Sequence, residues 1–281
     1  MTSSGASAGL GLLSAATWGG ADFAGGIGAR RSSALLVTTS GQIVSLLILL
    51  AICLTFRLTV PGWNYLSYAA IGGFEGALAL AAFYRALAMG AMGLTAALTG
   101  LLTAFVPVVY QLLHAGWPTP VTVCGLAGGC AAIWLITHSP SATGAEVPRR
   151  ALMLGAVAGA GFGAQLILFN MASEGGVLWA LTSARIAGVA ALVLVVALAP
   201  LTRPWRGFWL IGTLSGALDT VGNLFYILAA RHGRLDVAAV ICSLYPAGTI
   251  LLAAFVLHER PTRRQVAGMA LALGAVGLLS L

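Results

Sequence analysis

The sequence predicts an all-α membrane protein, with ten transmembrane helices in two inverted five-helix repeats around a central cavity. Three observations carry this prediction: an apolar composition, ten apolar runs of spanning length, and a second half that repeats the first. Only 7% of the 281 residues are charged, 59% are hydrophobic, and the mean hydropathy is +0.98. Soluble domains carry roughly 25% charged residues, so this chain cannot cover a water-facing surface. Within lipid the backbone must satisfy itself as helices, since the alternation typical of strands is absent.

Each apolar run is close to the roughly 20 residues that a helix needs to cross the hydrocarbon of a bilayer. The gaps between the runs are short and hold Arg, Pro or Gly, which leaves no room for a domain outside the membrane. The predicted spans are 8–29, 34–56, 66–88, 92–114, 119–138, 151–172, 177–199, 207–230, 235–257 and 264–281.

The repeat has an offset of 143 residues, at which Thr39–Ile43 (Thr-Ser-Gly-Gln-Ile) recurs as Thr182–Ile186 (Thr-Ser-Ala-Arg-Ile). Arg185 thereby corresponds to Gln42. Four residues recur as Gly233, Pro261, Thr262 and Gly268, and their first copies are Gly90, Pro118, Thr119 and Gly125. Five spans per half place the second copy upside down in the bilayer, as in many secondary transporters. The polar stretch from Ser139 to Arg150 joins the halves, so we expect repeats at 1–142 and 143–281 in one integral membrane domain.

The net charge of +7 comes from arginines in the gaps, because all 14 basic residues are Arg. Charges beside spans fix orientation in a membrane, and nothing resembles a nucleic-acid-binding module. More of these arginines fall on the side opposite the chain ends, which favours both termini outside. The cysteines and histidines have neither disulfide nor metal-ligand spacing, so we expect no metal and no cofactor.

Four charged residues fall well inside predicted spans: Asp22, Glu75, Arg185 and Asp219. A charge at mid-membrane costs at least about 2.5 kcal/mol on insertion scales, so each should face a cavity or a partner. An ion pair that locks helices together is one interpretation, and a substrate site is the other. One Arg cannot neutralise three acids, so at least one acid should be protonated. Proton exchange at Asp22 or Asp219 would couple transport to a proton gradient.

Polar and aromatic residues share helix faces with these charges. Asp219, Asn223 and Tyr226 are spaced i, i+4 and i+7, and Trp18 precedes Asp22 by one turn. Such a face suits a small amphipathic solute. Hydrogen bonding between helices is the alternative for Asn223, and packing is the alternative for Trp18.

Pro107 and Pro246 are expected to interrupt spans four and nine, because proline removes one helical hydrogen bond. In inverted-repeat carriers such breaks mark the binding site or a hinge. Ser243 and Tyr245 stand beside the second break and join the candidate binding residues. A plain kink is the alternative for both prolines.

Several short motifs occur in order along both halves of the chain. They are Trp18-Gly19, Phe83–Leu87 (Phe-Tyr-Arg-Ala-Leu), Ser243–Leu252, and His258–Thr262 followed by Gln265 and Gly268. In their order and spacing they resemble the drug/metabolite transporter superfamily, in its EamA-type branch of ten-span carriers. The resemblance covers both halves, but Gly116 replaces the acidic residue expected after span four. It implies alternating access, cytoplasmic termini and export of small metabolites across a bacterial inner membrane. Within this superfamily the chain is also similar to the branch of aromatic amino acid exporters.

We therefore expect a secondary exporter of amino acids, aromatic or large neutral ones first, rather than an enzyme. Arg185 would meet the substrate carboxylate, and Asp22, Glu75 or Asp219 would meet its amine. Efflux of cationic drugs or amines is the alternative within transport, and a membrane scaffold is the alternative outside it. The expected partners are a small molecule and the lipid bilayer, with no nucleic acid and a monomeric chain.

Overall fold

The computed structural model describes residues 3–89, 92–137, 148–198, 207–256 and 262–279, and all the regular structure in these ranges is helical. Parts of the repeat, of the linker and of the last motif lie outside the described residues: Gly90, 139–147 and 257–261. The helices are α1 (Ser3–Arg31), α2 (Ala34–Thr55), α3 (Trp63–Ala88), α4 (Met92–Ala115), α5 (Pro120–Thr137), α6 (Arg149–Ser173), α7 (Val177–Leu198), α8 (Phe208–His232), α9 (Leu235–Cys242), α10 (Tyr245–Val256) and α11 (Arg263–Leu279).

The described helices match the predicted spans, apart from the ninth, which is divided into α9 and α10. Ser243 and Leu244 separate the two pieces. Pro246 has no amide hydrogen for the carbonyl one turn before it, and Ala247 N instead donates to the Leu244 carbonyl over 2.9 Å. The interruption expected at Pro107 is wrong, because α4 continues through this residue. Transmembrane helices tolerate proline where neighbouring helices support the freed backbone groups.

Four described helices are by themselves long and apolar enough to cross a bilayer: α2, α3, α6 and α7. Shorter apolar segments cover 98–114, 120–132 and 235–249. Helix α1 has the length but is rich in Gly, Ala and Ser, which lowers its hydropathy. Such small residues let helix backbones approach closely, which is how helices associate in lipid.

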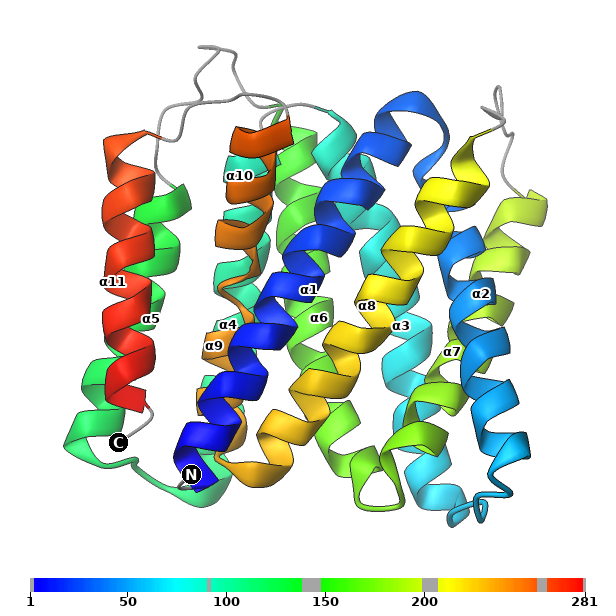
Figure 1. The fold of residues 1–281 in the computed structure, drawn as a ribbon, viewed down its shortest axis with the longest axis horizontal. Coiled ribbons are helices and arrows are strands. Elements are labelled where there is room, and N and C mark those ends of the chain that lie inside the picture. Colours follow the sequence, from blue (N-terminus) through cyan, green and yellow to red (C-terminus); the bar gives the residue numbers. More distant parts are fainter. Residues whose placement is uncertain (1–2, 90–91, 138–147, 199–206, 257–261, 280–281) are drawn as a thin grey trace.

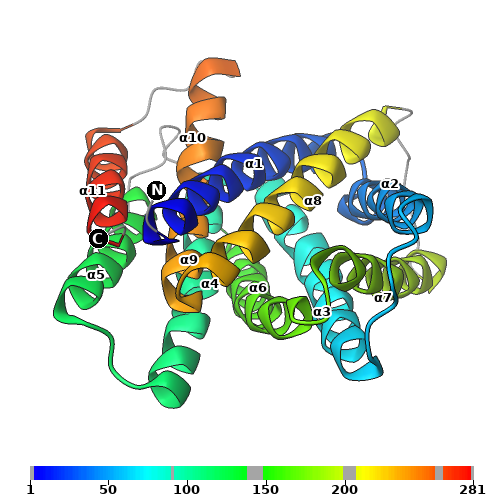
Figure 2. The same cartoon turned by 60° about the horizontal axis from the view of Figure 1, so that its bottom comes forward.

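Figure 1 shows the helices crossing the molecule in alternate directions, with both chain ends at the same end of the bundle. Helix α1 starts at that end, whereas α6 starts at the opposite one. Helix α1 packs along α8, and α3 packs along α6. The other helices group around these two pairs (Figure 2). We call the two groups the α1–α8 layer (α1, α2, α8, α9, α10) and the α3–α6 layer (α3, α4, α6, α7). Helices α5 and α11 pair with each other at one edge.

Contacts between helices recur at the offset of the sequence repeat. A Cβ built on Gly41 of α2 would lie 3.1 Å from the Gly216 Cα of α8. Residues 41 and 216 correspond to Ala184 of α7 and Gly73 of α3, and Gly73 likewise abuts the Ala184 backbone. This paired contact agrees with the repeat, and the boundaries 1–142 and 143–281 stay a prediction.

Arginines gather at the end of the bundle opposite the chain termini. Helices α1 and α3 end there, and α6 and α11 begin there (Figure 1). The described arginines of that end are Arg30, Arg31, Arg85, Arg149, Arg150, Arg263 and Arg264, against Arg57, Arg231 and Arg234 near the termini. The positive-inside rule thus continues to favour external termini, opposite to what the family resemblance implies.

Candidate functional site

A cavity lies between the two layers, with an empty volume of about 490 Å³ that includes its open part. Both layers contribute, because α1, α2, α8 and α10 face α3, α4, α6 and α7 across it. The lining residues are Trp18, Asp22, Gln42, Gly76, Leu80, Thr103, Phe162, Gln165, Leu166, Arg185, Asp219, Asn223 and Tyr245.

Arg185 forms an ion pair with Asp219 that links the layers across this cavity. Its Nη2 donates to Asp219 Oδ2 over 2.6 Å, and the two side chains are 5% and 15% exposed. Its Nη1 donates to Gln42 Oε1 over 2.9 Å, so the guanidinium of α7 holds α8 and α2 together. Of the three mid-span acids, Asp219 is therefore the partner of Arg185. Charge-assisted bonds of this kind are among the stronger interactions of a protein interior.

Asp22 is the cavity carboxyl that no fixed partner neutralises. The residue is buried, at 7% exposure, yet no described residue makes a hydrogen bond or ion pair with its carboxyl group. A buried acid without a partner is costly as a carboxylate, so it calls for a proton or a cation. Asp22 and Asp219 line the same cavity on α1 and α8.

Three further polar atoms of the cavity residues are buried with no hydrogen-bond partner in the described part of the chain: Trp18 Nε1, Arg185 Nε and Asn223 Oδ1. Asn223 Nδ2 is bound, since it donates to the Asp219 carbonyl over 2.7 Å and to Oδ1 over 3.0 Å. The Trp18 ring is also held, stacked on Tyr226 and edge-on to Tyr245, with ring centroids 6.0 and 6.5 Å away. The unpaired atoms thus belong to side chains in fixed positions. Two are donors and one is an acceptor.

Three predicted binding residues do not line the cavity. Tyr226 is fully buried beside it, and its hydroxyl donates to the Leu166 carbonyl over 2.7 Å. Ser243 is buried at the α9–α10 break, and its Oγ has no partner among the described residues. Glu75 lies on the α3–α6 seam, where a Cβ on Gly161 would be 3.5 Å from its Oε2.

The sequence could not show which face of α3 turns inward. Gly76, the residue after Glu75, lines the cavity and leaves room for Gln165, whose Nε2 donates to the Gly72 carbonyl over 2.9 Å. Glu75 therefore points elsewhere, although its Oε1 is also buried without a partner.

Seven lining residues were not predicted to bind substrate, and none of them carries a charge: Gln42, Gly76, Leu80, Thr103, Phe162, Gln165 and Leu166. The repeat held a signal for one of them, since Gln42 is the counterpart of Arg185. Among the described residues, no three His, Cys, Asp or Glu side chains gather as metal ligands would.

Comparison with known protein families gives a match for the second half of the chain. Residues 149–281 match the EamA-like transporter family. This is a family of small-molecule transporters rather than enzymes, and together with the apolar helices the match indicates a multi-pass membrane protein. The recognised superfamily and the all-α membrane fold are confirmed.

The fold also resembles 21 solved chains. One is described only as the crystal structure of a protein; it is 17% identical, the match covers 97% of this chain and 95% of that one, and the TM-score is 0.77. This likeness concerns the fold alone. No curated protein matches the sequence.

Proposed function

We propose that this EamA-like transporter exports amino acids, aromatic or large neutral ones first, across a bacterial inner membrane by alternating access. The observation that carries the proposal is the set of unpaired groups in the cavity: two buried N–H donors, one buried carbonyl acceptor and one carboxyl. A zwitterion supplies acceptors in its carboxylate and donors in its ammonium group. Unpaired buried polar groups in a native protein call for such an explanation.

The two ends of an amino acid suit different members of this set. Trp18 Nε1 and Arg185 Nε are donors for a carboxylate. Asp22 and Asn223 Oδ1 are acceptors for an ammonium group. Phe162 and its apolar neighbours in the cavity wall are suited to a hydrophobic side chain.

A zwitterion could also replace the ion pair between Arg185 and Asp219 when the cavity opens. Opening the cavity separates α7 from α8, which leaves a guanidinium and a carboxylate without each other. A bound amino acid offers the opposite charge to each of them. A solute with a single charge can replace only one partner, so a zwitterion lowers the cost of opening the most.

Proton coupling is part of the proposal, with Asp22 as the carrier because none of the described residues pairs with its carboxyl group. The carboxyl would take up a proton when the ammonium group leaves. Flux into liposomes, with and without a pH gradient, tests this in the wild type and in Asp22→Asn. We expect the variant to lose its dependence on the gradient, and Glu75→Gln, a mid-span acid outside the cavity, to retain it. Gradient dependence that persists in Asp22→Asn contradicts Asp22 as the carrier.

Three ligands that differ by one group test the substrate class: phenylalanine, phenethylamine without the carboxylate, and 3-phenylpropionate without the amine. The readouts are thermal stabilisation of the purified transporter and flux in liposomes. The proposal expects phenylalanine to stabilise the protein most and to be the ligand transported. Arg185→Gln should selectively weaken the response to ligands with a carboxylate.

Efflux of amines is the second candidate, and one observation favours it. Arg185 already binds Asp219 and Gln42, whereas the Asp22 carboxyl is unpaired within the described part of the chain. If phenethylamine is transported and phenylalanine is not, the amine reading holds and the amino acid proposal fails.

A further inference from the structure

Two tyrosines join the helix layers at opposite ends of the cavity. Tyr84 Oη of α3 lies 2.7 Å from Ser215 Oγ of α8 and 3.3 Å from the Ala21 carbonyl of α1. Ser215 Oγ donates to the same carbonyl over 3.0 Å. We call these three residues the Tyr84 latch. It joins the α3–α6 layer to both long helices of the α1–α8 layer.

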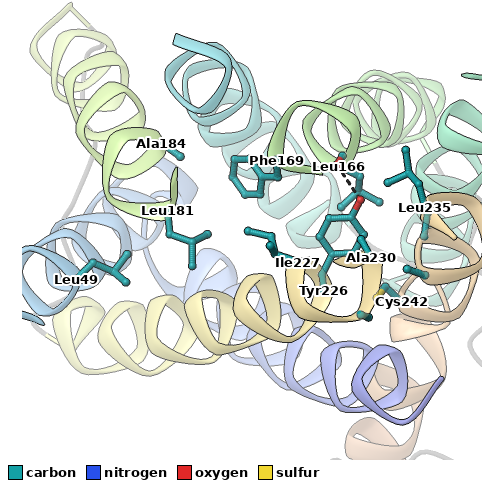
Figure 3. Close-up of a cluster of buried hydrophobic side chains, with 13 residues drawn as sticks. Leu49, Leu166, Phe169, Leu181, Ala184, Tyr226, Ile227, Ala230, Leu235 and Cys242 are labelled. Atoms are coloured by element: carbon teal, nitrogen blue, oxygen red, sulfur yellow. Dashed lines mark hydrogen bonds between the residues drawn. The ribbon is translucent and has the colours of Figure 1, made fainter. Parts of the chain in front are cut away.

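The second contact, the Tyr226 latch, consists of Tyr226 and Leu166. Tyr226 Oη of α8 donates to the Leu166 carbonyl of α6 over 2.7 Å (Figure 3). Here the hydroxyl comes from the α1–α8 layer and the carbonyl from the α3–α6 layer, the reverse of the first contact. Both tyrosines are buried, at 1% and 0% exposure, so water does not substitute for the bond.

The latches lie towards opposite ends of the bundle. Tyr84 is four residues before the end of α3, and Ser215 is seven residues after the start of α8. Those helix ends share the arginine-rich end of the molecule (Figure 1). Tyr226 is six residues before the end of α8, and Leu166 is seven before the end of α6. Both of these helices end where the chain termini lie (Figure 1).

Each latch is continuous with the cavity wall. Ala21 precedes Asp22, and Leu166 lines the cavity itself. Trp18, another lining residue, stacks on the Tyr226 ring at 6.0 Å. A solute that moves Asp22 or Trp18 therefore acts directly on a backbone carbonyl or a ring that forms a latch.

We propose that the Tyr84 and Tyr226 latches are the two gates of the transporter, and that the transport cycle opens one while the other stays closed. The inference rests on the proposed alternating access and adds the residues that perform it. Both latches are closed in this structure. Rocking one layer against the other about the cavity separates the layers at one end only, so it breaks one tyrosine contact and leaves the other.

Accessibility of a cavity cysteine from each side of the membrane tests the proposal. The reporter is Leu80→Cys, a cavity position, in a chain whose exposed Cys124 and partly buried Cys130 are changed to Ser. Cys53 and Cys242 are buried and stay, and the same chain without the reporter gives the background. Labelling rates with a membrane-impermeant maleimide are compared in right-side-out and inverted vesicles.

We expect Tyr84→Phe to speed labelling from one side and Tyr226→Phe to speed it from the other. One lost hydrogen bond corresponds to roughly a two- to tenfold rate change. Ser215→Ala is a second variant for the Tyr84 latch and should act on the same side. Tyr110→Phe is the matched control, because no described residue bonds that hydroxyl, and it should leave both rates unchanged.

Unchanged rates in both tyrosine variants, or faster labelling from the same side in both, overturn the proposal. The rates report conformation without any solute. A wild-type protein that fails to transport amino acids therefore overturns the proposed substrate, while opposite-side labelling still supports the gates.

Discussion

The ion pair between Arg185 and Asp219 makes a quantitative prediction about single and double substitutions. The Nη2–Oδ2 distance is 2.6 Å and both side chains are largely buried, so removing one partner leaves a buried charge. Breaking such a pair costs about 3–5 kcal/mol. In the Asp219→Asn variant, Arg185 keeps its hydrogen bond to Gln42. We therefore expect a loss of unfolding free energy at the lower end of this range, about 3 kcal/mol.

Arg185→Gln should lower the free energy of unfolding by less than Asp219→Asn does. An orphaned carboxyl can take up a proton and become neutral, whereas a guanidinium stays charged at any ordinary pH.

The double variant Arg185→Gln/Asp219→Asn should be more stable than Asp219→Asn alone, because it carries neither charge. Thermal unfolding of the purified proteins in detergent, followed by tryptophan fluorescence, measures all four. With about 2–4 °C per kcal/mol for a chain of this size, Asp219→Asn should unfold roughly 6–12 °C below the wild type. Additive losses in the double variant would refute the reasoning, because they would mean that the two charges do not interact.

Three other predictions concern packing, the helix break and orientation. Gly19→Ala should lower the unfolding temperature by forcing α1 from α10, since its Cβ would lie 2.8 Å from the Tyr245 carbonyl oxygen; Gly9→Ala, with nothing within 4 Å, is the control and should have no such effect. Pro246→Ala supplies an amide hydrogen across the α9–α10 break, so it should slow flux in liposomes while raising or preserving thermal stability; unchanged flux would contradict a hinge there. The arginine distribution predicts external termini, so a C-terminal alkaline phosphatase fusion should be active and a C-terminal green fluorescent protein fusion dark; the reverse would favour the orientation that the family resemblance implies.

The helices were predictable because spanning a bilayer is a local requirement on length and polarity. Each run of apolar residues had to be about as long as the hydrocarbon is thick, and short gaps with Arg, Pro or Gly marked its ends. The failure at Pro107 has the same origin. The sequence shows the missing hydrogen bond, but whether the helix breaks depends on how neighbouring helices support α4 there.

The site was only partly predictable, because it depends on how helices are rotated about their axes. The sequence could identify three charged lining residues, because a charge inside an apolar run is costly to insert into a membrane: Asp22, Arg185 and Asp219. It could identify Trp18 by its large aromatic side chain one turn before Asp22. Glu75 is just as costly to insert into a membrane, yet it lies on a face of α3 that does not line the cavity. Uncharged lining residues such as Phe162 and Leu80 give no signal in a sequence that is 59% hydrophobic.

The hydrogen bond between Gln42 and Arg185 joins two residues that are 143 positions apart, which is the offset of the repeat. A position can touch its own counterpart only beside the twofold axis that relates two copies. In an assembly of two identical chains the same side chain would face itself there, and two arginines would repel each other in a medium that screens charge poorly. A single chain that carries both copies can differ at this one position, with Arg on one side and Gln on the other. Joining the halves therefore allows Arg185 and Gln42 to occupy the two counterpart positions, whereas a symmetric dimer would hold the same residue at both.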